Sequence, residues 1–223
     1  MTEVPITAVT TRPLCWNCGG NAGRAPFCPA CGAIQTLPPD VDFFELLGVI
    51  GRLNFPEAEI EKTYHEFSRR FHPDFYRQKT EREREASLQN SALLNEAYRT
   101  LKDPFQRAEY VLKGNKKGIE ETKQVPKGLL EEVLEFQEAL ADLRSSGPPA
   151  AGQTSPEAKA LRERVQEWSA KLSRELMVTF QDWDAGSGNR EALLGRMKEI
   201  VLQRRYVKNL LRDVAGLTQE SLF

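Results

Sequence analysis

The chain has 223 residues, and its 31 basic and 32 acidic side chains leave a net charge of −1. A hydrophobic fraction of 40% and a charged fraction of 28% are ordinary for a folded protein, so disorder throughout the chain is excluded. The balanced charge provides no electrostatic attraction to nucleic acid or an anionic membrane, and no apolar run approaches the length of a membrane span. We therefore expect neither a nucleic-acid partner nor a membrane partner.

The first residues, MTEVPITAVTTRPL, lack the basic-then-apolar layout of a secretory signal. We expect a cytoplasmic protein, or a mitochondrial matrix protein if it is eukaryotic and processed. Residues 1–40, which we call the cysteine module, hold every cysteine of the chain. A segment this small cannot bury enough apolar surface to be stable unaided.

Two C-x-x-C pairs, separated by nine residues, predict a metal site in this module. Cys15 and Cys18 form the first pair, Cys28 and Cys31 the second, and a glycine follows each pair. Four thiolates make a closed tetrahedral site, which is typical of structural Zn²⁺. The glycines allow the backbone conformations that such knuckles need.

Other uses of the four cysteines stay open at this point. Iron or an iron–sulfur cluster is chemically compatible with four thiolates. A thioredoxin-like redox pair would need a βαβ context, and disulfides would need an oxidising compartment. A zinc ribbon can also bind nucleic acid, but only Arg12 and Arg24 lie near these cysteines.

From residue 42 onward the hydrophobic pattern is helical. We expect a short helix capped by Asp42, a second after Pro56 and ended by Pro73, a third over about 81–101, and a fourth over 105–112. Apolar side chains recur at three- and four-residue intervals in the second of these, at Ile60, Tyr64, Phe67 and Phe71, which predicts one buried face.

The second half of the chain predicts three longer helices, over about 127–144, 157–181 and 190–214. Residues 113–126 are rich in Lys, Gly and Glu and form a connector, and residues 145–156 form a flexible loop. Three amphipathic helices with such joins indicate an antiparallel bundle. The fold class is therefore mainly α.

The tripeptide His72, Pro73 and Asp74 lies between the second and third predicted helices. Alone it is weak evidence of function, but the segments around it make it informative. The segments DFFELLGV, KTYHEFSRRFHPDF and LLNEAYRTLKDPFQRAEYVL, within residues 42–112, closely resemble the J domain of DnaJ-like co-chaperones. The resemblance implies a helical hairpin with this HPD loop at its tip, which docks on a DnaK-type chaperone and promotes its ATP hydrolysis. Lys62, Arg69 and Arg70 would supply the basic face that meets the chaperone.

Those arginines also have a simpler explanation. Acidic residues early in the second helix and basic residues late in it complement the helix dipole. Arg69 and Arg70 can therefore stabilise the end of this helix without contacting any partner. No nucleophile, phosphate loop or other enzyme motif accompanies the HPD loop, and we expect no catalytic activity from this chain.

The first bundle helix carries more apolar surface than one core contact needs. At about 100° per residue, its core positions Leu129, Val133, Phe136, Leu140 and Leu143 share one line. Leu130, Leu134 and Ala141, which we call the leucine strip, lie about 100° to 140° away from that line. The strip either packs on another part of the chain or forms a partner groove ringed by acids.

A J domain followed by a bundle whose first helix contains LL…LEFQEAL resembles the HscB family of iron–sulfur cluster assembly. That resemblance covers the whole chain, because the cysteine module resembles that of eukaryotic and some bacterial members. It implies a domain order of cysteine module 1–40, J domain 41–113, connector 114–126 and scaffold-binding bundle 127–223.

The HscB resemblance also implies a function and a second set of site residues. The chain would stimulate a DnaK- or HscA-type chaperone and deliver an IscU-type iron–sulfur scaffold to it. The implied scaffold-binding residues are Leu130, Leu134, Glu135, Glu138, Asp142 and Tyr206. The alternatives are a general J-domain co-chaperone for other clients and a zinc-ribbon protein that binds nucleic acid.

Overall fold

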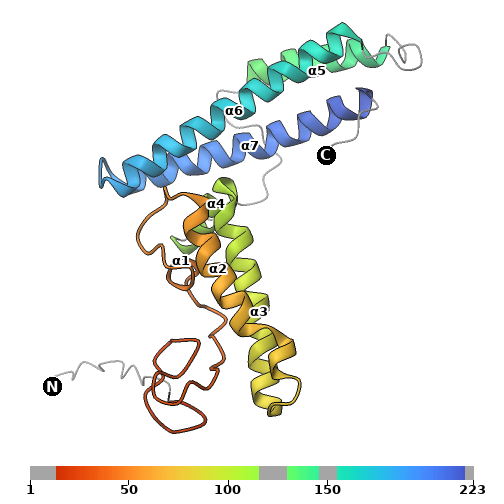
Figure 1. Ribbon diagram of the computed structural model, residues 1–223. Coiled ribbons are helices and arrows are strands. Elements are labelled where there is room, and N and C mark those ends of the chain that lie inside the picture. Colours follow the sequence, from red (N-terminus) through yellow and green to blue (C-terminus); the bar gives the residue numbers. More distant parts are fainter. Residues whose placement is uncertain (1–13, 116–129, 146–154, 219–223) are drawn as a thin grey trace, which may run out of the picture. The chain divides into compact units, whose positions relative to one another are not determined.

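The computed structural model describes residues 14–115, 130–145 and 155–218, with the backbone alone for 130–132 and 216–218. Within these ranges the chain forms seven α-helices and one 3-10 turn, and its only β interactions are two isolated bridges (Figure 1). The helices are α1 (Phe43–Leu46), α2 (Glu57–Phe71), α3 (Glu81–Lys102), α4 (Pro104–Gly114), α5 (Leu130–Ser145), α6 (Pro156–Asp184) and α7 (Arg190–Thr218), with the 3-10 turn at Pro73–Tyr76. The mainly α fold predicted from the sequence is confirmed.

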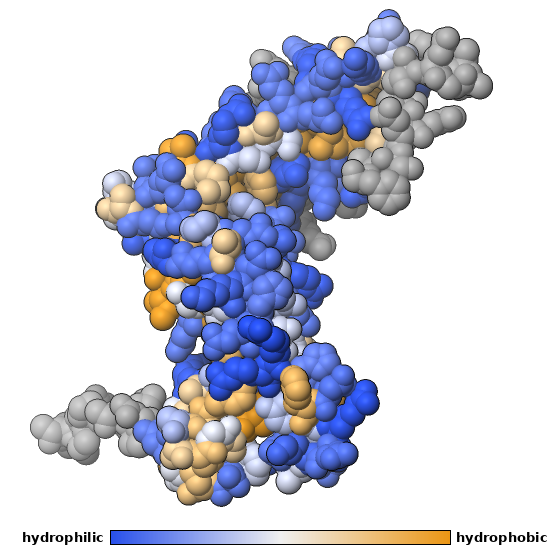
Figure 2. Space-filling model, in the orientation of Figure 1, coloured by the Kyte–Doolittle hydropathy of each residue, from blue (hydrophilic) through white to orange (hydrophobic). Residues whose placement is uncertain are grey.

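None of the helices in the described part of the chain combines the length and apolar composition needed to cross a bilayer. On the face drawn in Figure 2, hydrophilic side chains cover most of the helical surface, and apolar side chains gather over the cysteine module.

The chain divides into two compact units. One comprises Met1–Ile50 and Phe55–Lys102, and the other comprises Gly51–Asn54 and Asp103–Phe223. The first unit therefore holds the cysteine module with α1 to α3, and the second holds α4 to α7. The domain boundaries predicted at residues 40, 113 and 126 stay predictions.

The first unit is built on the antiparallel pair α2 and α3 (Figure 1). Ile60 and Phe71 of α2 and Leu94 of α3 are fully buried, as the helical pattern predicts. Tyr64 stacks on Tyr98 with ring centroids 4.3 Å apart. These contacts align the two helices, so the HPD loop that joins them lies at the end of a packed hairpin.

In the second unit, α4 packs against α6 and α7. The carboxylate of Asp184, at the end of α6, accepts hydrogen bonds from the backbone N–H groups of Leu53 and Asn54 at 2.6 and 2.8 Å. Arg107 of α4 is buried, donates to the Leu53 carbonyl and lies over the Phe180 ring. These contacts explain why residues 51–54 belong to the same unit as α4 and α6.

Two long antiparallel helices, α6 and α7, form the body of the second unit, and α5 packs against both (Figure 1). The core positions predicted for α5 are buried at Val133, Phe136 and Leu140. The long helices α6 and α7 each bury an apolar stripe, at Leu161, Val165, Leu172, Leu176, Leu193, Met197, Ile200, Val207 and Val214. Leu143 of α5, Trp168 of α6 and Leu211 of α7 are only half-buried, and Leu129 lies outside the described residues.

Candidate metal centre, HPD loop and bundle surface

Each C-x-x-C pair lies in a small knuckle of nearly identical backbone geometry. An isolated β-bridge closes each knuckle, between Leu14 and Asn21 in the first and between Phe27 and Ile34 in the second. Gly19 and Gly32, each directly after the second cysteine of its pair, adopt φ values of 69° and 73°. Such left-handed backbone favours glycine, so the role predicted for these residues is confirmed.

The four cysteine sulfur atoms converge on one point. All four Sγ atoms lie within 4.8 Å of one another, and the distances from Cys15 to Cys31 and from Cys18 to Cys28 are 3.6 and 3.8 Å. A tetrahedral site with zinc–sulfur bonds of about 2.3 Å has sulfur–sulfur edges of about 3.8 Å. The donor set and its spacing therefore fit a metal ion held by four thiolates.

The electrostatics of these thiols also favour a cation. Burial raises the pKa of the Cys15 thiol, but hydrogen bonds from the backbone N–H groups of Cys18 and Asn17 outweigh burial and lower the pKa to about 6. The backbone N–H of Gly20 lowers the pKa of Cys18, but the neighbouring thiols and desolvation raise it to about 12. The pKa is thus lowered at Cys15 and raised at Cys18, and a positive ion between the sulfur atoms would relieve the repulsion among four thiolates.

Side chains around the sulfurs hold them in place. The Asn17 side chain donates to Cys31 Sγ at 3.6 Å, and Gln35 Nε2 donates to Cys15 Sγ at 3.4 Å. The Trp16 indole N–H donates to the carbonyl of Ile34 at 2.7 Å, which ties the first knuckle to the second. Hydrogen-bonded groups of this kind orient the ligands of structural metal sites.

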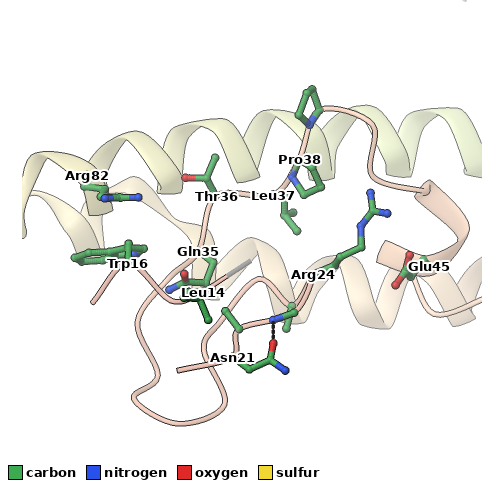
Figure 3. A pocket seen from close by; sticks show the side chains of 14 residues that line it. Leu14, Trp16, Asn21, Arg24, Gln35, Thr36, Leu37, Pro38, Glu45 and Arg82 are labelled. Carbon is green, nitrogen blue, oxygen red and sulfur yellow. Dashed lines mark hydrogen bonds between the residues drawn. The ribbon is translucent and has the colours of Figure 1, made fainter. Parts of the chain in front are cut away.

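A groove of about 950 Å³ is lined mostly by residues of the cysteine module, together with Glu45 of α1 and Arg82 of α3 (Figure 3). The Trp16 ring forms part of its wall, with the guanidinium carbon of Arg82 5.3 Å from the ring centroid. Arg24, Glu45 and Arg82 give the groove both positive and negative charge. The charge of its lining therefore selects neither an anion nor a cation.

The HPD loop is exposed at the end of the α2–α3 hairpin. The side chains of His72 and Asp74 are 52% and 58% exposed. His72 Nδ1 accepts a hydrogen bond from the backbone N–H of Asp74 at 3.3 Å, and Asp74 pairs with Arg77 at 2.9 Å. Pro73 begins the 3-10 turn, where its fixed φ suits a first position. The three side chains are thus held in a stiff turn that a partner can reach.

The predicted basic residues all lie on α2, and two of them also make contacts within the chain. Lys62 and Arg69 are exposed, and Arg69 donates to the carbonyl of His65 at 3.3 Å. The guanidinium carbon of Arg70 lies 3.7 Å from the centroid of the Phe27 ring, in the cysteine module. Lys62 and Arg69, seven residues apart, share one face of the helix.

Tyr206 of α7 lies against α5, the helix that carries the other predicted scaffold-binding residues. Gln137 of α5 donates to the Tyr206 hydroxyl at 3.4 Å. Leu134 is 53% exposed, and Ala141 is also exposed, so this described part of the leucine strip is open to a partner. The Leu130 side chain lies outside the described part of the chain.

The acidic side chains around Leu134 follow the same face of α5. Glu135, Glu138 and Asp142 are all exposed, and Glu135 pairs with Arg164 of α6 at 3.3 Å. They place negative charge beside the exposed Leu134 side chain.

Two residues that join the cysteine module to the hairpin were not predicted from the sequence. Phe27 stacks on Phe71, and the Asn90 side chain bonds the backbone at Leu37 and Gln35. One signal in the sequence could have identified Asn90, since it is a polar residue on the face of α3 that also carries Leu94. No pattern marks Phe27, because its partner lies far along the chain.

Comparisons with known proteins agree with this geometry. The DnaJ domain family matches residues 42–110. The "Iron-sulfur cluster co-chaperone protein HscB" of Homo sapiens is 36% identical over 209 residues, which cover 91% of this chain and 81% of that protein. The mouse protein of the same name is 30% identical, over 89% of this chain and 80% of its own length. The crystal structure of human co-chaperone protein HscB superposes with a TM-score of 0.72 and 28% identity, over 92% of this chain and 98% of that one.

Proposed function

The chain belongs to the HscB family of iron–sulfur cluster co-chaperones, and from this premise we propose that it stimulates the ATPase of a DnaK- or HscA-type chaperone and delivers an IscU-type scaffold to it. The observation that carries the proposal is the exposed HPD loop at the end of a packed hairpin. The relatives are named as co-chaperones, and we propose that this chain likewise acts on the chaperone's ATPase without catalysing a reaction itself.

The chaperone would be bound by the HPD loop and by α2. His72 offers a hydrogen-bond donor, Asp74 offers a carboxylate for an ion pair, and Pro73 limits the loop to few conformations. Lys62, Arg69 and Arg70 would meet an acidic surface of the chaperone, where charge complementarity speeds association. Exposure of Lys62 and Arg69 on α2 supports this role.

The scaffold would be bound by α5 together with Tyr206 of α7. Leu130 and Leu134 would supply apolar anchors, and Tyr206 an aromatic edge. Glu135, Glu138 and Asp142 would surround them and attract a basic partner surface. The exposure of Leu134 beside these acids supports the proposal, since large exposed apolar side chains ringed by charge are typical of binding sites.

The four cysteines would bind Zn²⁺ as a structural ion. A closed set of four thiolates leaves no position for a substrate, which is the arrangement of structural rather than catalytic zinc. The site needs reduced thiols, as found in the cytoplasm and the mitochondrial matrix.

The test is the steady-state ATPase rate of an HscA- or DnaK-type chaperone with this chain, measured with and without an IscU-type scaffold. We expect stimulation by the chain alone and a greater-than-additive rate when the scaffold is present. Stimulation without synergy would instead indicate a J-domain co-chaperone with other clients. A chaperone whose rate is unchanged by the chain would contradict the proposal.

A further inference from the structure

The cysteine module contacts the hairpin at the residues that immediately precede the HPD loop. The Phe27 ring stacks on the Phe71 ring, with centroids 5.5 Å apart and planes 20° apart. The guanidinium carbon of Arg70 lies 3.7 Å from the centroid of the same Phe27 ring. Phe71 is fully buried and is the last residue of α2, so the next residue is His72.

A second contact joins the module to α3. The fully buried Asn90 accepts from the backbone N–H of Leu37 at 2.9 Å and donates to the carbonyl of Gln35 at 2.8 Å. The side chain of Gln35 in turn donates to the sulfur of Cys15. A buried network whose groups are all paired is rigid, so this contact fixes the module against the hairpin.

The same helix holds the backbone of Phe71. The hydroxyl groups of Ser87 and Ser91 on α3 both donate to the Phe71 carbonyl. Phe71 is therefore fixed through its carbonyl by α3 and through its ring by Phe27. Because the HPD loop begins at the next residue, these two contacts of Phe71 also fix the position of the loop.

We infer that Phe27 is a positioning residue for chaperone docking, and that the ion held by the cysteines sets the position of Phe27. Phe27 is bonded directly to the ligand residue Cys28. In the described part of the module, the buried hydrophobic residues are Cys15, Ala22, Cys28, Ile34 and Leu37, and two of these are cysteines of the metal site itself. A cluster of this size does not hold a fold by itself, so the metal ion must fix the knuckle that carries Phe27.

This inference rests on the proposed function and predicts a specific kinetic effect. With the Phe27 ring in place, Arg70 is restrained before the chaperone arrives, and less side-chain freedom is lost on binding. The exposed ion pair between Arg70 and Glu66, at 3.7 Å, adds little to this restraint. Loss of the ring should therefore weaken docking without changing the stimulated rate at saturation.

The experiment measures ATPase stimulation against co-chaperone concentration for the zinc-loaded full chain and its Phe27→Leu variant. We expect the concentration for half-maximal stimulation to rise about three- to fivefold, the effect of losing one cation–π contact, with the maximal rate unchanged. Phe27→Tyr keeps the ring and should behave as the wild type. Metal content, measured by elemental analysis, should remain one ion per chain.

The matched control is Phe105→Leu, which removes a similar contact in the other unit, where the Arg204 guanidinium carbon lies 5.1 Å from the Phe105 ring centroid. This control should leave both kinetic parameters unchanged. Equal half-maximal concentrations for wild type and Phe27→Leu, with the ion retained, would overturn the inference. A wild-type chain that stimulates no chaperone would overturn the proposed function instead.

A second measurement needs neither a variant nor a chaperone. Amide hydrogen exchange of residues 69–76 is compared between the zinc-loaded chain and the chain stripped with a chelator. We expect faster exchange across this segment in the stripped chain and full recovery when zinc is restored. Unchanged exchange there, while amides of the cysteine module exchange faster, would show that the ion stabilises the module alone and would overturn the inference.

Discussion

At the scale of single residues, the contacts of His72 fix the orientation of its ring. Its Nδ1 accepts the Asp74 backbone N–H, so the neutral ring carries its proton on Nε2. The Phe75 ring lies edge-on to the imidazole with centroids 6.1 Å apart. These contacts orient the ring and leave the Nε2 proton for a partner.

Substituting His72 by Gln should abolish ATPase stimulation and leave the fold intact. His72 is half exposed, so its loss should change the free energy of unfolding by less than about 0.5 kcal/mol. The readouts are stimulated ATPase rate and urea unfolding followed by circular dichroism. The control is His65→Gln, at the chain's other histidine, which is 63% exposed and pairs with Glu61. Retained stimulation by His72→Gln would contradict the role of the loop.

The sequence predicts these local sites well and the contacts between them poorly. The spacing of Cys15, Cys18, Cys28 and Cys31 is itself the signature of a metal site, because each knuckle is a short turn. The contacts of Phe27 with Arg70 and of Asn90 with Leu37 join residues more than forty positions apart. Such contacts depend on how the module lies on the hairpin, and periodicity carries no information about that.

At the scale of helices, the sequence predicts which helices form and which of their faces are buried better than it predicts where the helices end. The capping of α1 by Asp42 and the end of α2 before Pro73 follow from local rules and are confirmed. By contrast, α6 continues to Asp184, a few residues beyond the expected end. Its last residue accepts the backbone N–H groups of Leu53 and Asn54, and this long-range contact leaves no trace in the local pattern.

The exposed face of α5 provides the prediction at this scale. We expect the double substitution of Leu134 and Tyr206 by Ala to weaken binding of an IscU-type scaffold by at least about tenfold, because apolar and aromatic anchors dominate binding energy. Affinity is measured by calorimetry, and basal chaperone stimulation should be unchanged.

The matched control for this face is Leu88→Ala on α3, where the leucine is 58% exposed but lies in the other unit. Its scaffold affinity should equal that of the wild type. A loss of helical circular dichroism in the double variant would indicate that Leu134 and Tyr206 serve packing, and an unchanged affinity would exclude them from the scaffold site.

At the scale of the whole chain, the two proposed binding functions belong to different compact units. The HPD loop and the cysteine module lie in the first unit, whereas α5 and Tyr206 lie in the second. Each unit has its own buried residues, such as Phe71 and Leu94 in the first and Phe180 and Met197 in the second. The metal ion should therefore affect the first unit and leave the second unchanged.

Removal of the ion tests this division. In the chain stripped with a chelator, we expect faster amide exchange in residues 14–40, because their knuckles depend on the four thiolate ligands. The far-UV circular dichroism should change little, since the described residues of the module contain no helix. Amide exchange of α6 and α7 and the affinity for the scaffold should equal those of the zinc-loaded chain.

The Cys18→Ser, Cys31→Ser double variant, prepared without a chelator, should reproduce the same pattern. A stripped chain that loses the protection of α6 and α7 would show instead that the two units fold as one.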